Sequence, residues 1–130
     1  MGVDFPPYER IEGDRSRGLI LICDHASNAL PPEYGDLGLP SIEFARHIAY
    51  DIGARNVTLG LAAMLGVPAL LSTYSRLLID PNRGEDDPTI VMRLSDGTVI
   101  PGNHPITAQE IEGRIERFHR PYHAAIAGEI

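Results

Sequence analysis

Residues 18–28 read GLILICDHASN, an apolar run followed at once by a polar cluster. The run Leu19–Cys23 is continuously apolar rather than alternating, which predicts a strand buried on both faces of a sheet. The cluster Asp24–Asn28 begins where this strand ends. Ligands of open α/β sheets bind at the carboxyl ends of the strands. This stretch therefore indicates both an α/β fold and the place of a site.

Helical and extended patterns alternate after this strand. Residues 41–49 carry apolar residues at helical spacing, with Ser41 as the expected N-cap. Residues 54–65 repeat the pattern, and residues 67–71 predict a second buried strand. The face of the second helix that we expect to be buried consists of Val57, Leu61, Met64 and Leu65.

The last part of the chain predicts a hairpin and a long helix. Asp96-Gly97 is a typical two-residue hairpin turn within an otherwise loop-like region. Thr107 and Glu110 form a capping box, from which a helix runs towards Ala127. Pro121 falls within this helix and is expected to kink or divide it. The order of strands and helices indicates an α/β layer fold.

The length of 130 residues is typical of one domain, and 43% hydrophobic residues are ordinary for a globular protein. We expect a charged N-terminal arm over residues 1–17, which either drapes over the surface or forms an edge strand. A single α/β domain would follow over residues 18–130. The start of the chain lacks the apolar segment of a signal peptide, so we expect a cytoplasmic protein without a membrane partner.

Charge and residue usage exclude several classes of function. The net charge of −7 argues against a nucleic-acid partner, which would require a basic face. All 11 basic residues are Arg, so the chain has no Schiff-base or P-loop lysine, and Arg must hold any anionic substrate. The single Cys excludes an intramolecular disulfide and a zinc cluster of several cysteines.

The cluster after the first strand is the strongest candidate site. His25 could bind a metal through one ring nitrogen, with Asp24 as a possible orienting partner. The alternative is a surface histidine in a turn that Asp24 and Asn28 favour. Ser27 could be a nucleophile, but it lacks the Gly-x-Ser-x-Gly pattern.

A second polar segment surrounds a short apolar stretch. Arg76 and Arg83 could hold an anionic substrate through their guanidinium groups, with Asn82 beside them. Arg76 could equally form a structural ion pair with Asp80. The sequence leaves both interpretations of Arg76 open.

Two further positions carry weaker signals. His119 and His123 lie four residues apart, a spacing that resembles zinc-binding helices but more often belongs to surface histidines. Asp51 stands at an expected helix interruption, from which its carboxylate could reach into a site.

Five stretches together resemble the N-formylglutamate amidohydrolase family. They occur in the order of the family and extend over most of residues 19–126. The stretches are LICDHASNALPPEYGDLGL (21–39), HIAYDIGA (47–54), YSRLLIDPNR (74–83), SDGTVIPGN (95–103) and RPYHAAI (120–126).

The resemblance implies a three-layer α/β/α fold of the phosphorylase/hydrolase type, related to zinc carboxypeptidases, of which this chain resembles the N-terminal half. It implies hydrolysis of the amide bond of an N-acylated acidic amino acid, such as N-formylglutamate, to glutamate and formate. It also implies a place in histidine degradation. The expected cofactor is Zn²⁺, whose bound water attacks the carbonyl.

The resemblance assigns roles to individual residues. His25 would be a metal ligand, and Asp51 and His123 would be catalytic. Asn28 stands where zinc carboxypeptidases carry Glu, so another carboxylate must serve as the base. The residues expected to bind the substrate are Ser27, Asn28, Arg76, Asn82 and Arg83.

Two other functions fit the same scaffold. One is a deacylase or amidase with a different N-acyl substrate, since a fold does not determine a substrate. The other is a catalytically incomplete binding module. In each case the expected partner is a small anionic amino acid, and a homo-oligomer is possible.

Overall fold

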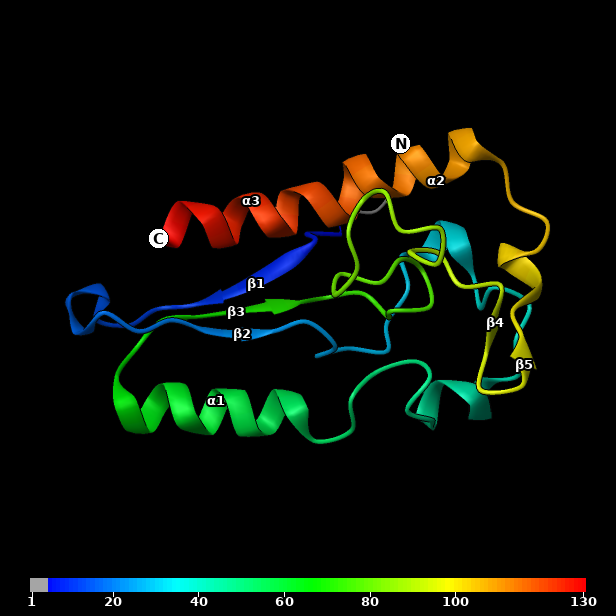
Figure 1. Ribbon diagram of the computed structural model, residues 1–130. Helices are drawn as coiled ribbons and strands as arrows, with labels where there is room; N and C mark the ends of the chain where they lie inside the picture. Colours follow the sequence, from blue (N-terminus) through cyan, green and yellow to red (C-terminus); the bar gives the residue numbers. More distant parts are fainter. Residues whose placement is uncertain (1–4) are drawn as a thin grey trace.

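The computed structural model describes residues 5–130. Its main sheet has three strands in the order β1-β3-β2 (Figure 1). The central strand β3 (Ala69–Ser72) is parallel to β2 (Leu21–Cys23) and antiparallel to β1 (Tyr8–Ile11). The N-terminal arm thus forms an edge strand, one of the two possibilities that its sequence left open. Residues 1–4 of the arm lie outside the described residues.

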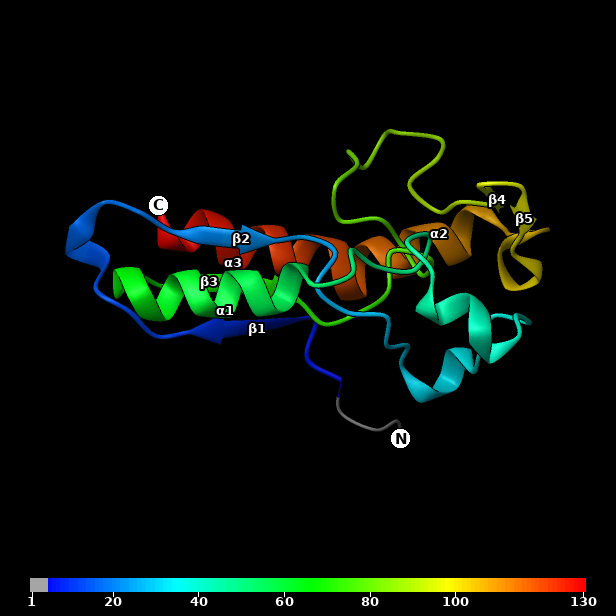
Figure 2. The same cartoon turned by 90° about the horizontal axis from the view of Figure 1, so that it is seen from below.

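Helices lie on both faces of this sheet. Helix α1 (Ala54–Leu65) packs against β2 and β3, whereas α3 (Arg120–Glu129) packs against β1 and β3. Figure 1 shows the two helices on opposite sides of the strands, and Figure 2 shows the same arrangement from below. The protein is therefore a mixed α/β structure. No helix within residues 5–130 is long and apolar enough to cross a membrane.

The prediction that the first strand is buried on both faces is wrong. Leu21 and Cys23 pack in a cluster with α1, but Ile22 remains 45% exposed and Leu19 is exposed as well. The physical reason is the position of β2, which pairs with β3 on one side and lies at the edge of the described sheet. An edge strand leaves part of its apolar surface uncovered.

Helix α1 has the expected bounds but not the expected buried face. Gly66 ends the helix in a left-handed conformation with φ 66°, as the sequence indicates. The side that packs on the sheet carries Ala54 and Ala62, whose small side chains allow close approach, together with Leu59. The apolar stripe that we expected to be buried is exposed instead, and it comprises Val57, Leu61, Met64 and Leu65.

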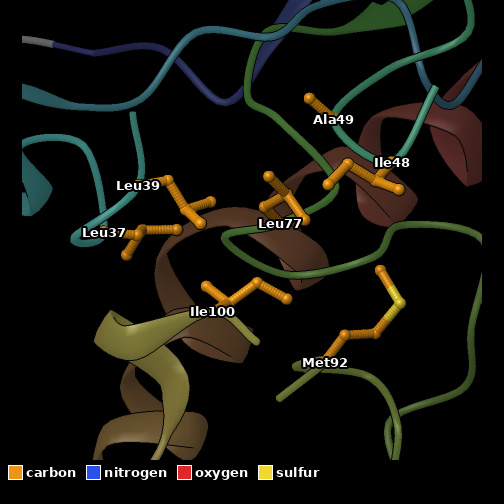
Figure 3. Packing of buried hydrophobic residues seen from close by; sticks show 7 residues of the cluster. All are labelled: Leu37, Leu39, Ile48, Ala49, Leu77, Met92 and Ile100. Atoms are coloured by element: carbon orange, nitrogen blue, oxygen red, sulfur yellow. The ribbon is translucent and has the colours of Figure 1, made fainter. Parts of the chain in front are cut away.

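The prediction of a helix over residues 41–49 is wrong. A short 3-10 segment covers Ser41–Ala45, and the side chain of Ser41 caps nothing. Arg46 then returns to an extended backbone, which ends the helical turn. The apolar residues after it are nevertheless buried in a second core, built from loops (Figure 3). Its buried members are Leu37, Leu39, Ile48, Ala49, Leu77, Met92 and Ile100.

A buried amide holds the loops of this second core together. Asn103 is fully buried, and its Nδ2 donates to the carbonyl oxygens of Leu77 and Met92 at 2.7 and 2.9 Å. Its Oδ1 accepts from Nη1 of the buried Arg114 at 2.7 Å. These bonds satisfy polar groups that would otherwise be costly to bury. The loop-like region before the last helices is therefore packed.

The predicted hairpin forms across Asp96-Gly97, between β4 (Leu94–Ser95) and β5 (Thr98–Val99). The predicted cap of the last helical region also forms, because Thr107 Oγ1 accepts from the Glu110 N–H at 3.0 Å.

The last helical region consists of three consecutive parts. Helix α2 (Ala108–Arg114) leads into a π-helical segment, Ile115–His119, and then into α3. Pro121 lies in the first turn of α3, where its missing N–H is tolerated. The helical run continues through Pro121, and the irregular part is the π-helical segment that precedes it.

Candidate active site

His25 lies directly after β2, and its ring is placed between two carboxylates. The side chain is buried, with Nε2 2.7 Å from Asp80 Oδ1 and Nδ1 3.3 Å from Asp51 Oδ2. The backbone N–H of Asp51 also donates to the carbonyl oxygen of His25 at 3.0 Å. This bond attaches the loop before α1 to the loop after β2. The three side chains thus meet at the carboxyl end of a parallel strand.

Asp80 is the centre of this arrangement. It is 1% exposed, and its carboxylate also accepts from the backbone N–H of Asn82 at 2.9 Å. Two cations pair with Oδ2, Arg76 at 2.9 Å and Arg83 at 3.3 Å. Burial alone would raise the pKa of Asp80, but the hydrogen bonds of His25 and Asn82 and the nearby positive charges lower that pKa to about 2. Asp80 is therefore an anion at neutral pH.

This anion orients the ring of His25. Burial lowers the pKa of His25, yet the hydrogen bond and charge of Asp80 outweigh it, so that the net effect raises this pKa. In the neutral ring, the short contact with Asp80 favours the proton on Nε2. The lone pair of Nδ1 then faces Asp51. A carboxylate behind one ring nitrogen is how proteins commonly orient a histidine that binds a metal through the other.

His25 and Asp51 line a cleft of about 520 Å³ beside β2. Asn82 and Asp24 also line it, together with apolar side chains of β2 and α1. The buried Tyr122 donates its hydroxyl proton to Asp24 Oδ1 at 2.6 Å. Burial and this bond raise the pKa of Tyr122, which keeps the hydroxyl a donor. Sequence reasoning missed this pair, since 98 residues separate its members.

The contacts of Arg76 show the structural ion pair with Asp80, one of the two interpretations that the sequence leaves open. Its Nη2 pairs with Asp80, while Nη1 lies 3.5 Å from His25 Nδ1 and 4.0 Å from Asp51 Oδ1. One end of the guanidinium group is thus engaged, and the other end reaches the His25–Asp51 pair. Arg76 could therefore hold a substrate carboxylate only through Nη1.

Arg83 is engaged in contacts within the chain. Beside its ion pair with Asp80, its Nη1 donates to Thr89 Oγ1 at 2.8 Å and approaches Asp87 Oδ2 at 3.8 Å. These contacts attach the acidic loop after Arg83 to the centre of the site. They support a structural role for Arg83.

Ser27 and Asn28 do not line the cleft of His25. Ser27 Oγ accepts from the Ala29 N–H at 3.0 Å, and Asn28 Nδ2 donates to the carbonyl oxygen of Phe44 at 2.7 Å. Both side chains thus stabilise the turn after β2 and its contact with the next segment. The structure does not bring them together with the other predicted site residues.

The two histidines of the last helical region hold the segment that follows Asp80. Nε2 of His123 lies 2.8 Å from the carbonyl oxygen of Pro81, and Nε2 of His119 lies 2.7 Å from that of Arg83. Their rings pack at a centroid distance of 4.5 Å. His119 is buried, unlike the surface histidine that its spacing most often indicates. His123 is thus connected to the site through the backbone of this segment.

The donor set fits a divalent metal in part. Nδ1 of His25 and the carboxylate of Asp51 are a nitrogen and an oxygen donor of the kinds that zinc accepts, and they converge at one cleft. Catalytic zinc sites usually have three protein ligands. Over residues 5–130, no group of three or more His, Cys, Asp or Glu side chains is arranged to hold a metal ion. His25 and Asp51 would account for two of the ligands such a site needs.

The fold and the site define an α/β protein with a polar cleft at the carboxyl end of a parallel strand, an arrangement typical of α/β enzymes. The model of the N-formylglutamate amidohydrolase family matches residues 17–130. The chain belongs to this family, as the five sequence stretches indicate. A comparison with curated proteins finds no match.

Solved structures show the same fold in longer proteins. A gene product of Agrobacterium tumefaciens superimposes with a TM-score of 0.87 at 28% identity, over 95% of this chain and 49% of that one. An N-formylglutamate amidohydrolase of Ralstonia eutropha JMP134 gives a TM-score of 0.57 at 24% identity, over 96% and 51%. This chain thus spans about half the length of each protein.

Proposed function

We propose that this chain forms the metal- and substrate-binding part of an amidohydrolase that cleaves an N-acylated acidic amino acid such as N-formylglutamate. The observation that carries the proposal is that His25 and Asp51 line one cleft at the end of β2 and that Arg76 reaches both of them. Membership of the family supports the reaction class. The complete fold would be the three-layer arrangement of the phosphorylase/hydrolase type.

In this proposal Zn²⁺ would be held by His25 Nδ1 and Asp51, with further ligands from outside residues 5–130. When bound, the metal would polarise the amide carbonyl and lower the pKa of a coordinated water. The hydrogen bond of His25 Nε2 with Asp80 fixes the ring so that Nδ1 points into the cleft. The chain's own contribution is thus an oriented nitrogen donor and a carboxylate beside it.

The substrate carboxylate would be held by Arg76. Its Nη1 is the guanidinium nitrogen nearest to the His25–Asp51 pair, and its other end is fixed by Asp80. A guanidinium group held in this way loses little conformational freedom when it binds an anion. Asn82 lines the same cleft and offers an amide group to the substrate.

Metal binding is tested separately from activity. Zn²⁺ affinity of the chain would be measured by competition with a chromogenic chelator, for the wild type and for His25→Ala. The expected result is binding of one Zn²⁺ that His25→Ala weakens at least about tenfold, since one of two ligands is lost. His47→Ala is the control, because His47 is exposed and does not line the cleft. Equal affinity of His25→Ala and wild type would contradict the assignment.

Activity is tested by formate release from N-formylglutamate in the presence of Zn²⁺. The assay uses the chain alone and the chain mixed with the half of the Agrobacterium tumefaciens gene product that it does not match. Release that His25→Ala and Asp51→Asn abolish would support the proposal. N-acetylglutamate, tested in parallel, identifies the alternative of a different acyl group. Binding of N-formylglutamate without release would favour the binding-module alternative.

A further inference from the structure

Asp24 is a carboxylate of the cleft that has no part in the proposed function so far. It lines the same cleft as His25 and Asp51 and is partly exposed there. The sequence indicates Asp24 as a possible orienting partner of His25, but Asp80 makes that contact. The carboxylate of Asp24 is therefore placed to contact a molecule bound in the cleft.

Two buried hydroxyl groups hold Asp24 in position. Tyr122 of α3 donates to Oδ1 at 2.6 Å, and Ser72 of β3 donates to the backbone carbonyl oxygen of Asp24. Both donors are at most 2% exposed, so they hold the residue from the interior. A group that is already fixed loses little conformational freedom when it binds a ligand. Asp24 is thus prepared for a contact on the side of the cleft.

The charge of Asp24 has no basic partner within the described part of the chain. The other two carboxylates of the site do have one. Asp80 pairs with Arg76 at 2.9 Å, and Asp51 lies 3.3 Å from the ring of His25. By contrast, the side-chain contact of Asp24 is the neutral hydroxyl of a tyrosine. A partly buried anion is stabilised by a cation, so the chemistry favours a positive ligand group here.

The positive group could be a metal ion or an ammonium group. Within residues 5–130, Asp24 does not join His25 and Asp51 in a group arranged to hold a metal ion. An ammonium group requires no such convergence, because its N–H donors can each bond to a separate acceptor. The cleft therefore fits an amino group beside Asp24 better than a metal ion.

We propose that Asp24 is a specificity-determining residue, which binds the amino group of the amino acid that the reaction releases and the amide N–H of the substrate. This amino group forms only if the chain cleaves an N-acyl amino acid, so the role of Asp24 rests on the proposed function. Arg76 would hold a carboxylate of the same molecule. Two contacts of opposite charge then distinguish an amino acid from a dicarboxylate without nitrogen.

The charge on the nitrogen changes during the reaction. The oxygen of water bonds to the carbonyl carbon, and the carbon–nitrogen bond breaks with its electron pair left on the nitrogen. Both protons of the water end on that nitrogen, which becomes an ammonium group, while the acyl group leaves as a carboxylate. Asp24 accepts from a neutral N–H before cleavage and faces a full positive charge afterwards. The contact therefore becomes stronger as the amine is released.

L-Glutamate and glutarate test this role, because they differ by the ammonium group. The full 130-residue chain would be titrated with each ligand and followed by NMR, with a chelator present so that no metal ion binds the ligands. We expect the wild type to bind L-glutamate about tenfold more tightly than glutarate, since a hydrogen bond between two charged groups is gained. The ¹³C signal of the Asp24 carboxyl carbon should shift with L-glutamate and not with glutarate.

Two variants show whether Asp24 causes the preference. Asp24→Asn removes the charge at nearly constant shape and should reduce the preference for L-glutamate to less than about twofold. Asp86→Asn removes one charge from an exposed loop position that does not line the cleft, and it should keep the preference. Circular dichroism checks that both variants fold. If Asp24→Asn does not fold, the carboxyl signal of the wild type decides the role of Asp24.

The possible outcomes separate this role from the proposed function. Binding of both ligands with equal affinity would overturn the role of Asp24 and leave the proposed function intact. A preference that persists in Asp24→Asn would also overturn it, because the amino group would then bind elsewhere. Equal loss of the preference in Asp86→Asn would assign the effect to the overall charge. If neither ligand bound to the wild type, the substrate class of the proposed function would fail, and the role of Asp24 with it.

Discussion

Asp80 holds His25 at 2.7 Å from the buried side, while the opposite nitrogen of the ring faces Asp51 and the cleft. The same carboxylate pairs with two arginines. One buried anion thus fixes a histidine and two cations, and the geometry of the site depends on its charge.

Asp80→Asn tests this dependence. The amide keeps the shape of the side chain but removes the charge, which leaves Arg76 and His25 near a neutral group in a buried site. We expect a loss of about 3 kcal/mol in the free energy of unfolding, measured by urea denaturation. Asp87→Asn is the matched control, because Asp87 approaches Arg83 only at 3.8 Å and is partly exposed. If both variants lost a similar small amount of unfolding free energy, the charge of Asp80 would not hold the site together and the prediction would fail.

Tyr122→Phe removes the hydroxyl that donates to Asp24 at 2.6 Å. Because the acceptor is a carboxylate and the tyrosine is fully buried, we expect a loss of about 2 kcal/mol in thermal or urea unfolding. Tyr74→Phe is the comparison. Tyr74 is also fully buried, but its hydroxyl lies 3.5 Å from its acceptor, so its removal should cost less. An equal cost for both variants would contradict the importance of the Asp24 contact.

His119 makes stability depend on pH. Burial lowers its pKa below the ordinary value of 6.5, and its Nδ1 has no partner that could accept a second ring proton. As the pH falls below that value, the unfolded chain takes up a proton at His119 before the folded chain does, so the folded state loses stability. His119→Gln keeps an N–H donor for Arg83 but does not titrate.

The measurement for His119 compares the free energy of unfolding of wild type and His119→Gln between about pH 8 and about pH 5. The stability of the wild type relative to the variant should decrease as the pH is lowered. The difference between the two proteins isolates His119 from His25, whose raised pKa acts in the opposite direction. A difference that does not vary with pH would contradict the prediction.

Two glycines should respond oppositely to replacement by alanine. A Cβ at Gly13 would come within 2.1 Å of the backbone carbon of Val67, so Gly13→Ala should destabilise the fold by about 3 kcal/mol. A Cβ at Gly60, inside α1, would meet no atom within 4 Å. Gly60→Ala should therefore stabilise the protein by about 1 kcal/mol, because alanine favours the helix. Thermal unfolding of both variants checks the pair, and equal signs would contradict it.

The sequence predicts the local elements of the site better than their assembly. The change from apolar to polar residues at Cys23 and Asp24 locates the end of β2 and hence His25. The spacing of Arg76 and Asp80 indicates their ion pair, since both residues belong to one short segment. Nothing local indicates that His25 meets Asp80, which is 55 residues away, because chain topology decides that contact.

The errors in the prediction have two physical causes. Periodicity identifies an apolar stripe on α1 but does not say whether another element covers it, and Val57 and Met64 are exposed where the pattern predicts burial. Over residues 41–49, tertiary packing of Ile48 and Ala49 overrides the weak helical pattern. The pairs His25–Asp51 and Tyr122–Asp24 depend on long-range topology in the same way.

The π-helical segment Ile115–His119 sets how α3 is rotated about its axis relative to α2. The N–H of Arg120 bonds to the carbonyl oxygen of Ile115, five residues back, so this turn holds one residue more than an α-turn. If the same residues formed an ordinary α-turn, everything after this segment would rotate by roughly 100° relative to α2. Tyr122 and His123 would then turn away from Asp24 and Pro81. The wide turn therefore decides which side of α3 reaches the site.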